Sequence, residues 1–251
     1  MSEAISMRII AHIRSDFPTK FGIPRQSGLV ETLRAAIVFE PEYRNPDALR
    51  GIEGFSHIWL LWEFSAARRE GWSPTVRPPR MGGNTRMGVF ATRSPFRPNA
   101  VGLSSVRLEG VNLHTPEGPV LYISGADLMD GSPILDIKPY LPYTDAHPDA
   151  KSGFAPAAPD PRLEVDCPSQ LLERLPADRR EALLDVLAQD PRPAYQHTPD
   201  RVYGMVFAGN DVRFRVEGER LTILEIRPEE KTLGDSAASA ERAGAAKHSK
   251  L

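Results

Sequence analysis

The segment Asp136-Ile137-Lys138-Pro139-Tyr140 combines an acid, a base and a phenol at alternate positions. Successive side chains of a β-strand point to opposite faces, so this spacing predicts Asp136, Lys138 and Tyr140 on one face. Such a trio could bind a polar substrate and transfer a proton. An ordinary ion pair on a solvated strand face explains the spacing equally well, and both interpretations stay open.

A second candidate is the segment Gly71–Leu108, which contains no acidic residue and no lysine. Its basic side chains are all arginines: Arg77, Arg80, Arg86, Arg93, Arg97 and Arg107. A guanidinium group presents a planar fork of donors that can bind phosphate or carboxylate bidentately. The arginines could instead solvate a surface and pair with carboxylates elsewhere. Because a neutral surface usually mixes both signs of charge, the pattern favours anion binding.

Small and polar residues also gather at predicted strand ends. Pro24-Arg25-Gln26 lies in a loop before a predicted strand, and Thr92–Asn99 is a loop stiffened by prolines. Ser124-Gly125-Ala126-Asp127 ends a strand with small residues, where a ligand can approach the backbone closely. We predict that these three loops contribute to a binding site.

The segment Asp190–Tyr195 holds a guanidinium, Arg192, and an aromatic ring, Tyr195, between prolines. Such a pair can stack on an exposed nucleic-acid base, and it can equally form a packing corner. His57 lies inside an apolar segment, which is more typical of a hydrogen-bonded core histidine than of a catalytic one.

Several familiar sites are absent from the sequence. It has no G-x-G-x-x-G fingerprint, no phosphate-binding loop ending in Gly-Lys-Ser/Thr and no G-x-S-x-G nucleophile segment. The six histidines show no H-x-x-x-H spacing, and Cys167 is the single cysteine. These absences argue against Rossmann and hydrolase folds. We also expect no metal site, and a single cysteine cannot form an internal disulfide.

Composition places the chain among globular proteins. Its 251 residues are 41% hydrophobic and 25% charged, with a net charge of −2. No apolar run is long enough to cross a bilayer, and residues 1–8 lack the pattern of a signal peptide. We therefore expect a cytoplasmic protein that does not associate with membranes.

Strand patterns separated by turns dominate the first part of the chain, with few helix-length periodic segments between them. This pattern of elements predicts a mainly β fold, either an antiparallel barrel or a sandwich, and argues against a doubly wound fold. The predicted strands span residues 5–13, 33–39, 57–64, 87–92, 101–113, 120–128 and 134–140. The strand 57–64 is almost continuously apolar, so we expect both of its faces to be covered.

Beyond residue 149 the pattern changes. Residues 150–164 have the composition of a linker. Helices are predicted at 168–175 and 177–189, followed by short strands at 202–207, 212–216 and 221–226. We therefore predict a barrel domain at 1–149, a small α+β domain at 165–228 that docks on the barrel, and a disordered tail at 229–251.

The chain resembles the TsaA/TrmO-like tRNA methyltransferases over about residues 9–228. The resemblance rests on long motifs in the family's order: Phe21–Val30 with its Pro24-Arg25-Gln26, Gly54–Trp59, Thr75–Arg80, Gly88–Arg93, Asp136–Pro142 and Leu187–Tyr195.

That resemblance implies a non-Rossmann β-barrel methyltransferase domain, S-adenosylmethionine as cofactor, and a homodimer. The implied substrate is tRNA that carries threonylcarbamoyladenosine next to the anticodon, methylated on its exocyclic nitrogen. The cofactor contacts implied for this chain are Pro24, Arg25, Gln26, Ser65, Ala66, Arg93, Leu103, Ser124, Gly125, Ala126 and Asp127. Ser65-Ala66 stands where some relatives carry His-Gln, so only a backbone contact could be kept there.

The chemistry is consistent with this implication. The nitrogen nucleophile is delocalised into a ureido carbonyl, so a base should help. We predict Asp136 or Tyr140 as proton acceptor and Lys138 as a cation for the threonyl carboxylate. The predicted tRNA contacts are Arg77, Arg80, Arg97, Arg192 and Tyr195. Two alternatives stay open: a non-catalytic tRNA-binding adaptor, and a methyltransferase that acts on a small molecule.

Overall fold

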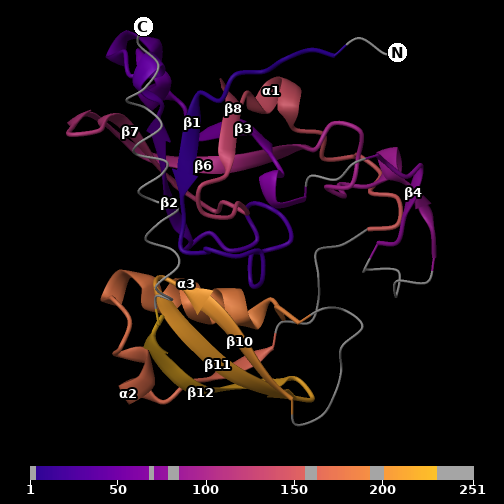
Figure 1. Ribbon diagram of the computed structural model, residues 1–251, viewed down its shortest axis with the longest axis vertical. Helices are drawn as coiled ribbons and strands as arrows, with labels where there is room; N and C mark the ends of the chain where they lie inside the picture. Colours follow the sequence, from indigo (N-terminus) through magenta and orange to yellow (C-terminus); the bar gives the residue numbers. More distant parts are fainter. Residues whose placement is uncertain (1–3, 68–70, 79–84, 156–162, 193–200, 231–251) are drawn as a thin grey trace, which may run out of the picture.

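A closed antiparallel barrel forms the upper part of the molecule in the computed structural model, which describes residues 4–67, 71–78, 85–155, 163–192 and 201–230 (Figure 1). The strand order around the barrel is β1-β2-β7-β6-β3-β8. The strands are β1 (Ala11–Arg14), β2 (Arg34–Phe39), β3 (His57–Glu63), β6 (Val101–Thr115), β7 (Gly118–Ser124) and β8 (Pro133–Pro139). The mainly β, barrel-type fold predicted from the sequence is confirmed.

The barrel interior follows from period-two patterning. On β3, Ile58, Leu60 and Trp62 are buried, whereas the alternate side chains are only partly buried. Inward-facing aliphatic residues of the other barrel strands complete the same core. The expectation that β3 is covered on both faces is therefore wrong: its apolar residues also occupy the outer face of the barrel.

Two predicted strands are shorter than their patterns. β1 begins at Ala11 rather than at residue 5, because β2 and β8 pair only from Ala11 onward and Ile5 is exposed. The segment 87–92 contributes only β5 (Met87–Gly88), which pairs with β4 (Thr75–Val76) outside the barrel. The following residues turn into the 3-10 helix η6 (Val89–Ala91).

The lower unit is a four-stranded sheet of order β10-β11-β12-β9, covered by helices (Figure 1). Its elements are β9 (Glu164–Asp166), α2 (Ser169–Leu172), α3 (Ala177–Ala188), β10 (Val202–Phe207), β11 (Asn210–Glu217) and β12 (Arg220–Pro228). β9 runs parallel to β12 at the end of the predicted linker and was not predicted. Residues 156–162 of that linker and 231–251 of the predicted tail lie outside the described residues, and the domain boundaries stay predictions.

The long loop between β1 and β2 belongs to both units. Phe17, Val30 and Leu33 of this loop are buried in the core of the lower unit, together with Leu183 of α3 and Phe207 of β10. The amide of Ala208 also donates to the carbonyl of Asp16 at 3.0 Å. The loop that carries Pro24-Arg25-Gln26 is therefore held in place by the C-terminal unit.

Short helical turns connect the barrel strands: η1 (Pro41–Tyr43), η2 (Pro46–Leu49), η3 (Ile52–Gly54), η4 (Ser65–Ala67) and α1 (Pro142–Asp145). No helix within the described ranges is long and apolar enough to span a membrane.

Candidate functional site

A cavity of about 880 Å³ opens at the barrel end where β1, β3 and β7 finish and β2, β6 and β8 begin. Most of the predicted cofactor residues line it: Pro24, Arg25, Gln26, Ser65, Ala66, Arg93, Leu103 and Asp127. All the residues that line the cavity come from four segments of the chain, 20–26, 62–67, 92–104 and 127–132. The predicted Ser124, Gly125 and Ala126 do not line the cavity but lie directly before Asp127 in the chain.

The loops carrying Pro24–Gln26 and Ser124–Asp127 touch each other through their backbones. The amide of Gly28 donates to the carbonyl of Gly125 at 2.9 Å, and the amide of Gly125 donates to Leu33 at 2.9 Å. Gly125 has φ +76°, and a Cβ there would lie 3.5 Å from Gly28. A glycine suits this position because it permits both the left-handed conformation and the close approach.

Arg93 joins a third segment to this contact. Its Nη1 donates to Oε1 of Gln26 at 2.5 Å, so the loop after η6 contacts the loop that carries Pro24–Gln26. Arg97 Nη1 donates to the carbonyl of Thr92 at 3.0 Å and braces the same turn. Both guanidinium groups line the cavity, and in these two hydrogen bonds each donates to an uncharged oxygen rather than to a carboxylate. They are available for an anionic group of a ligand.

The cavity wall contains a hydrogen-bonded chain of three side chains. Trp62 Nε1 donates to Ser104 Oγ at 3.0 Å, and Ser104 Oγ donates to Asp127 Oδ1 at 2.6 Å. Gly102 makes room for the indole, because a Cβ at that position would lie 2.3 Å from Trp62 Cε2. Phe64 packs against Trp62 with ring centroids 4.2 Å apart.

Asp127 is the one carboxylate among the described residues that line the cavity. Burial raises the pKa of Asp127, and the hydrogen bond from Ser104 and the charge of Arg93 only partly oppose this rise. A desolvated carboxylate with a raised pKa can bind a cationic group strongly or accept a proton. The cavity thus combines a negative group, the guanidinium groups of Arg93 and Arg97, and aromatic walls.

The predicted catalytic trio lies elsewhere. Lys138 Nζ pairs with Asp136 Oδ2 at 2.9 Å, and the two side chains are 62% and 40% exposed. Tyr140 packs against Trp59, with ring centroids 5.5 Å apart. None of the three is among the residues lining the cavity. Asp136 and Lys138 share one face of β8, as their spacing predicts, but that face is the outside of the barrel, and their catalytic role stays a prediction.

The predicted tRNA contacts are spread over the molecule. Arg77 is exposed beside β4, and Arg97 lies at the cavity. Arg192 Nε pairs with Asp190 Oδ1 at 2.8 Å, and its side chain is only 10% exposed. This pairing lowers the pKa of Asp190 despite burial, which acts in the opposite direction, and it favours a structural role for Arg192. Arg80 and Tyr195 lie outside the described residues.

Several cavity residues lie outside the predicted loops and were not predicted, among them Lys20, Trp62, Phe64 and Ser104, whereas Phe96 and Asn99 belong to the predicted loop Thr92–Asn99. Trp62 and Phe64 carry no sign of a site in the sequence, because they continue the apolar pattern of β3. One usable signal was Gly102, since a glycine inside a strand often marks close packing.

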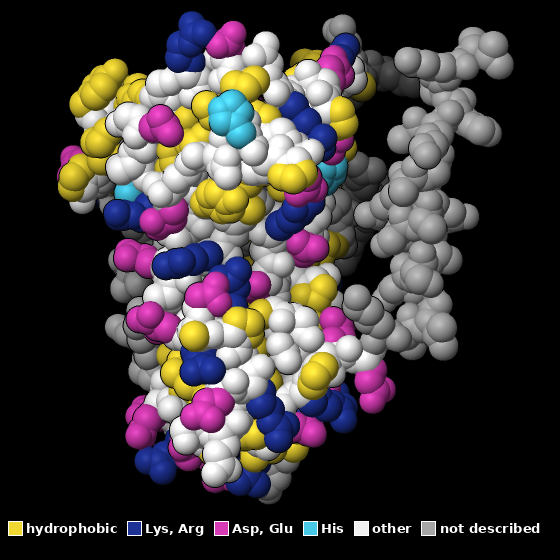
Figure 2. Space-filling model, turned by 90° about the vertical axis from the view of Figure 1, so that its left-hand side faces the viewer, with side chains coloured by type: hydrophobic (Ala, Val, Ile, Leu, Met, Phe, Trp, Pro, Cys, Tyr) yellow, Lys and Arg dark blue, Asp and Glu magenta, His cyan; other side chains and the backbone are white. Residues whose placement is uncertain are grey.

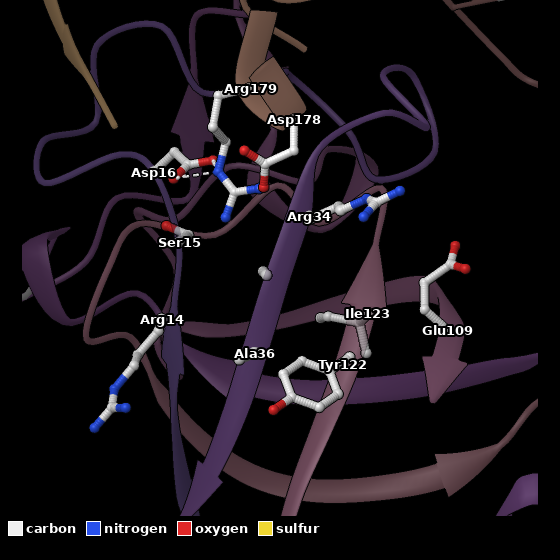
Figure 3. A pocket seen from close by; sticks show the side chains of 11 residues that line it. Arg14, Ser15, Asp16, Arg34, Ala36, Glu109, Tyr122, Ile123, Asp178 and Arg179 are labelled. Carbon is white, nitrogen blue, oxygen red and sulfur yellow. Dashed lines mark hydrogen bonds and ion pairs between the residues drawn. The ribbon is translucent and has the colours of Figure 1, made fainter. Parts of the chain in front are cut away.

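A second cavity, of about 540 Å³, lies between the barrel and the start of α3 (Figure 3). Arg179 and Asp16 point toward each other at its edge, while Tyr122 lines it from β7. Its charged lining residues balance: Arg14, Arg34 and Arg179 against Asp16, Glu109 and Asp178. This balance gives the cavity no preference for an anion, and none of the predicted site residues lines it.

A search for metal ligands finds no group of three or more His, Cys, Asp or Glu side chains suited to a metal ion within the described residues.

Two family profiles match this chain, one over the barrel and one over the C-terminal unit. The profile of the tRNA-methyltransferase O N-terminal domain matches residues 12–146, and that of the TrmO C-terminal domain matches residues 160–229. The tRNA (adenine(37)-N6)-methyltransferase of Escherichia coli (strain K12) is 41% identical over 227 residues, which are 87% of this chain and 96% of that protein.

A protein of Pseudomonas aeruginosa named as a putative S-adenosylmethionine-dependent methyltransferase, RcsF, is 45% identical over 217 residues, covering 83% of this chain and 91% of the relative. The fold also matches a crystal structure of TrmO from the same species. That match has a TM-score of 0.74 and 38% identity, and covers 91% of this chain and 99% of the other.

Proposed function

The chain belongs to the tRNA-methyltransferase O family, and from this membership we propose that it is an S-adenosylmethionine-dependent enzyme that methylates N6 of adenine 37 in tRNA. The observation that carries the proposal is the convergence of four separate chain segments on one cavity at the barrel end. A tRNA-binding adaptor would need no such cavity.

The residues of this cavity fit the cofactor chemically. S-adenosylmethionine supplies an electrophilic methyl group on a positively charged sulfur, together with an ammonium, a carboxylate and an adenine ring. Arg93 and Arg25 match the carboxylate, and Asp127 matches the ammonium or the ribose hydroxyls. Trp62, Phe64 and Phe96 supply apolar surface for the ring. We assign the cofactor to this cavity on that complementarity.

The main work of the protein is alignment, because a neutral thioether leaves without acid catalysis. Arg93 holds Gln26 and so fixes the loop that faces the cofactor. The Trp62–Ser104–Asp127 chain orients one carboxylate oxygen, since Ser104 donates to Oδ1 of Asp127. Asp127 is thereby a second candidate for proton acceptor, beside the predicted Asp136 and Tyr140, and it has the advantage of lying in the cavity.

We further assign threonylcarbamoyladenosine as the substrate nucleoside. Its threonyl carboxylate needs a cation, and Lys20, Arg25 and Arg97 line the cavity together with Arg93. Lys138 is the predicted partner for this carboxylate, but its pairing with Asp136 on the outer barrel face makes the lining cations the better candidates.

The family resemblance also supports a homodimer. Leu103 is consistent with this, because it lies on the outer face of β6 beside the cavity and is 52% exposed. The proposed substrate, tRNA, implies a cytoplasmic enzyme.

A methylation assay with purified protein tests the proposal. The substrates are tRNA bearing threonylcarbamoyladenosine and the same tRNA without it, each with S-adenosylmethionine, and the readout is mass analysis of the nucleosides. We expect methylation of the modified tRNA, and loss of it in Arg93→Ala. Cofactor binding without any tRNA methylation would instead favour a small-molecule substrate, and no cofactor binding would favour the adaptor.

A further inference from the structure

The segment that contains β4 projects from the side of the barrel (Figure 1). Two large aromatic side chains close to β4 and β5 in the chain, Trp72 and Phe90, are exposed. Trp72 is 53% exposed and Phe90 is 71% exposed. Their rings lie together, with centroids 6.1 Å apart and planes inclined by 32°. Isolated exposed apolar residues are common, but two adjacent exposed rings are a feature of binding surfaces.

The backbone holds this pair in place. Val89, next to Phe90, is buried, and its amide donates to the carbonyl of Pro74 at 2.9 Å. The β4–β5 pairing joins the same two segments, with Thr75 opposite Gly88. The 3-10 turn that contains Phe90 therefore carries one side chain into the protein and presents the next one to solvent.

The aromatic pair is close in the chain to residues that line the cofactor cavity, although neither Trp72 nor Phe90 lines it. Arg93, which lines the cavity, follows Phe90 by one turn, and the amide of Thr92 donates back to Val89 at 3.2 Å. Phe96 also lines the cavity and is partly exposed. A chain that entered the cavity could therefore run along this turn to the two rings.

The chain segment that carries the two rings is rich in arginine. No acidic residue occurs between Gly71 and Leu108. Arg86 Nη1 donates to the uncharged Thr75 Oγ1 at 3.1 Å, and Arg77 is exposed. By contrast, Figure 2 shows a face on which acidic and basic side chains are interspersed. The aromatic surface is thus suited to a polyanion rather than to a mixed protein surface.

We propose that Trp72 and Phe90 form a stacking platform for unpaired nucleotides beside the target adenosine, with Arg77 and Arg86 contacting their phosphates. This inference rests on the proposed function, since it names where that RNA lies. Single-stranded RNA is bound by aromatic rings that stack on bases and by cations that follow the backbone. A second copy of the chain is the alternative occupant of this surface, and the molecular mass of the protein in solution distinguishes it.

Binding of a synthetic anticodon stem–loop RNA, measured by fluorescence anisotropy over a range of salt concentrations, tests the platform. Trp72→Ala and Phe90→Ala should each weaken binding about 5- to 150-fold, the range expected for one lost base stack. Their log–log salt slopes should match that of the wild type, because no charge is removed. Arg77→Ala should instead reduce the slope by roughly 0.7.

Matched variants separate stacking from general apolar contact. Phe90→Leu keeps an apolar side chain without a π face and should bind as weakly as Phe90→Ala, whereas Phe90→Trp should bind like the wild type. Tyr143→Ala removes another exposed ring, outside the arginine segment, and should have no effect. All variants should keep the affinity for S-adenosylmethionine, the melting temperature and the molecular mass in light scattering.

The outcomes are distinguishable. Wild-type protein that methylates tRNA, with Phe90→Ala and Phe90→Leu binding RNA normally, overturns the platform and leaves the proposed function intact. A fall in molecular mass in these variants also overturns it, because the rings would then contact a second copy. Wild-type protein that methylates tRNA but does not bind the stem–loop overturns the platform alone, and wild-type protein that neither binds the stem–loop nor methylates tRNA overturns both proposals.

Discussion

Asp16, in the loop after β1, and Arg179, in the first turn of α3, form an ion pair that joins the barrel to the C-terminal unit (Figure 3). Arg179 Nε lies 2.9 Å from Asp16 Oδ2 and donates to Oδ1 at 3.1 Å. Nearby, Thr32 Oγ1 donates to Asp185 Oδ2 at 2.7 Å. Because Pro24–Gln26 lies between Asp16 and Thr32, these contacts link the cofactor loop to the C-terminal unit at both ends.

Arg179→Met should destabilise the protein by roughly 1–3 kcal/mol, because it leaves a largely buried carboxylate without its cation. It should also weaken cofactor binding, because the ion pair anchors the loop that carries Pro24–Gln26. Urea denaturation and calorimetry measure the two effects. The double variant Asp16→Asn/Arg179→Met is the control and should lose less stability than the single one; an equal or larger loss would contradict the pairing argument.

The same ion pair predicts a pH dependence. Burial raises the pKa of Asp16 above its ordinary value, and Arg179 opposes this rise. When the pKa of a carboxyl group is raised in the folded state, the folded protein becomes less stable as pH rises from the ordinary pKa through the raised pKa. Without Arg179 the pKa should rise further, so the deficit of Arg179→Met should be small in acid and grow with pH. A deficit that does not change with pH would speak against this explanation.

Gly102→Ala should impair the cofactor cavity. The new methyl group would overlap the rigid Trp62 ring, whose displacement breaks the hydrogen bond to Ser104. Overpacking of this kind typically costs about 1–3 kcal/mol, and we expect weaker S-adenosylmethionine binding in calorimetry. Gly110→Ala is the matched control, because Gly110 lies on the same strand with open space around its Cβ position. Similar behaviour of both variants would refute the steric argument.

Cofactor affinity should fall with decreasing pH as Asp127 becomes protonated. Burial raises the pKa of Asp127, so the fall should begin at a higher pH than an ordinary carboxylate would give. Above the raised pKa the carboxylate is ionised, and the affinity for S-adenosylmethionine should reach its maximum. Asp127→Asn should bind more weakly and lose this dependence, which calorimetry across pH would reveal. If Asp127→Asn kept the pH dependence of the wild type, Asp127 could not be the group that causes this dependence.

Single-turnover methylation separates the two carboxylates proposed as proton acceptor. Loss of a general base typically costs about 100- to 10,000-fold in rate. Asp127→Asn should show such a loss at saturating cofactor if Asp127 accepts the proton. Asp136→Asn, which alters an exposed ion pair worth about 0–1 kcal/mol, should then remain near the wild-type rate and melting temperature. The reverse result would restore the assignment to Asp136, with Lys138→Ala then expected to raise the apparent constant for tRNA.

Arg97→Ala and Arg192→Ala should differ although both residues were predicted to bind tRNA. Arg97 lines the cavity, so its loss should weaken tRNA binding and reduce the salt slope by roughly 0.7–0.9. Arg192 is nearly buried against Asp190, so its loss should lower the melting temperature and leave the slope unchanged. Binding isotherms at several salt concentrations, with melting curves, distinguish them; a reduced slope in Arg192→Ala would contradict the structural role.

Local patterning in the sequence determined the barrel-type fold and most of the strands. The spacing of Ile58, Leu60 and Trp62 predicts β3, and Val202–Phe207 predicts β10, because side-chain alternation is a property of the strand itself. β9 was missed because a three-residue strand has too little pattern, and its parallel partner β12 is more than fifty residues away.

Only the tertiary structure decided which residues meet. Closure of the barrel sets the register, and a bulge opposite Leu61 and Trp62 fixes the outward direction of Asp136, which alternation alone leaves open. The meeting of Gln26 with Arg93, and of Gly28 with Gly125, depends on contacts between distant segments. Sequence periodicity carries no information about such contacts, because they arise when strands pair across the barrel and when the C-terminal core takes in the loop around Phe17.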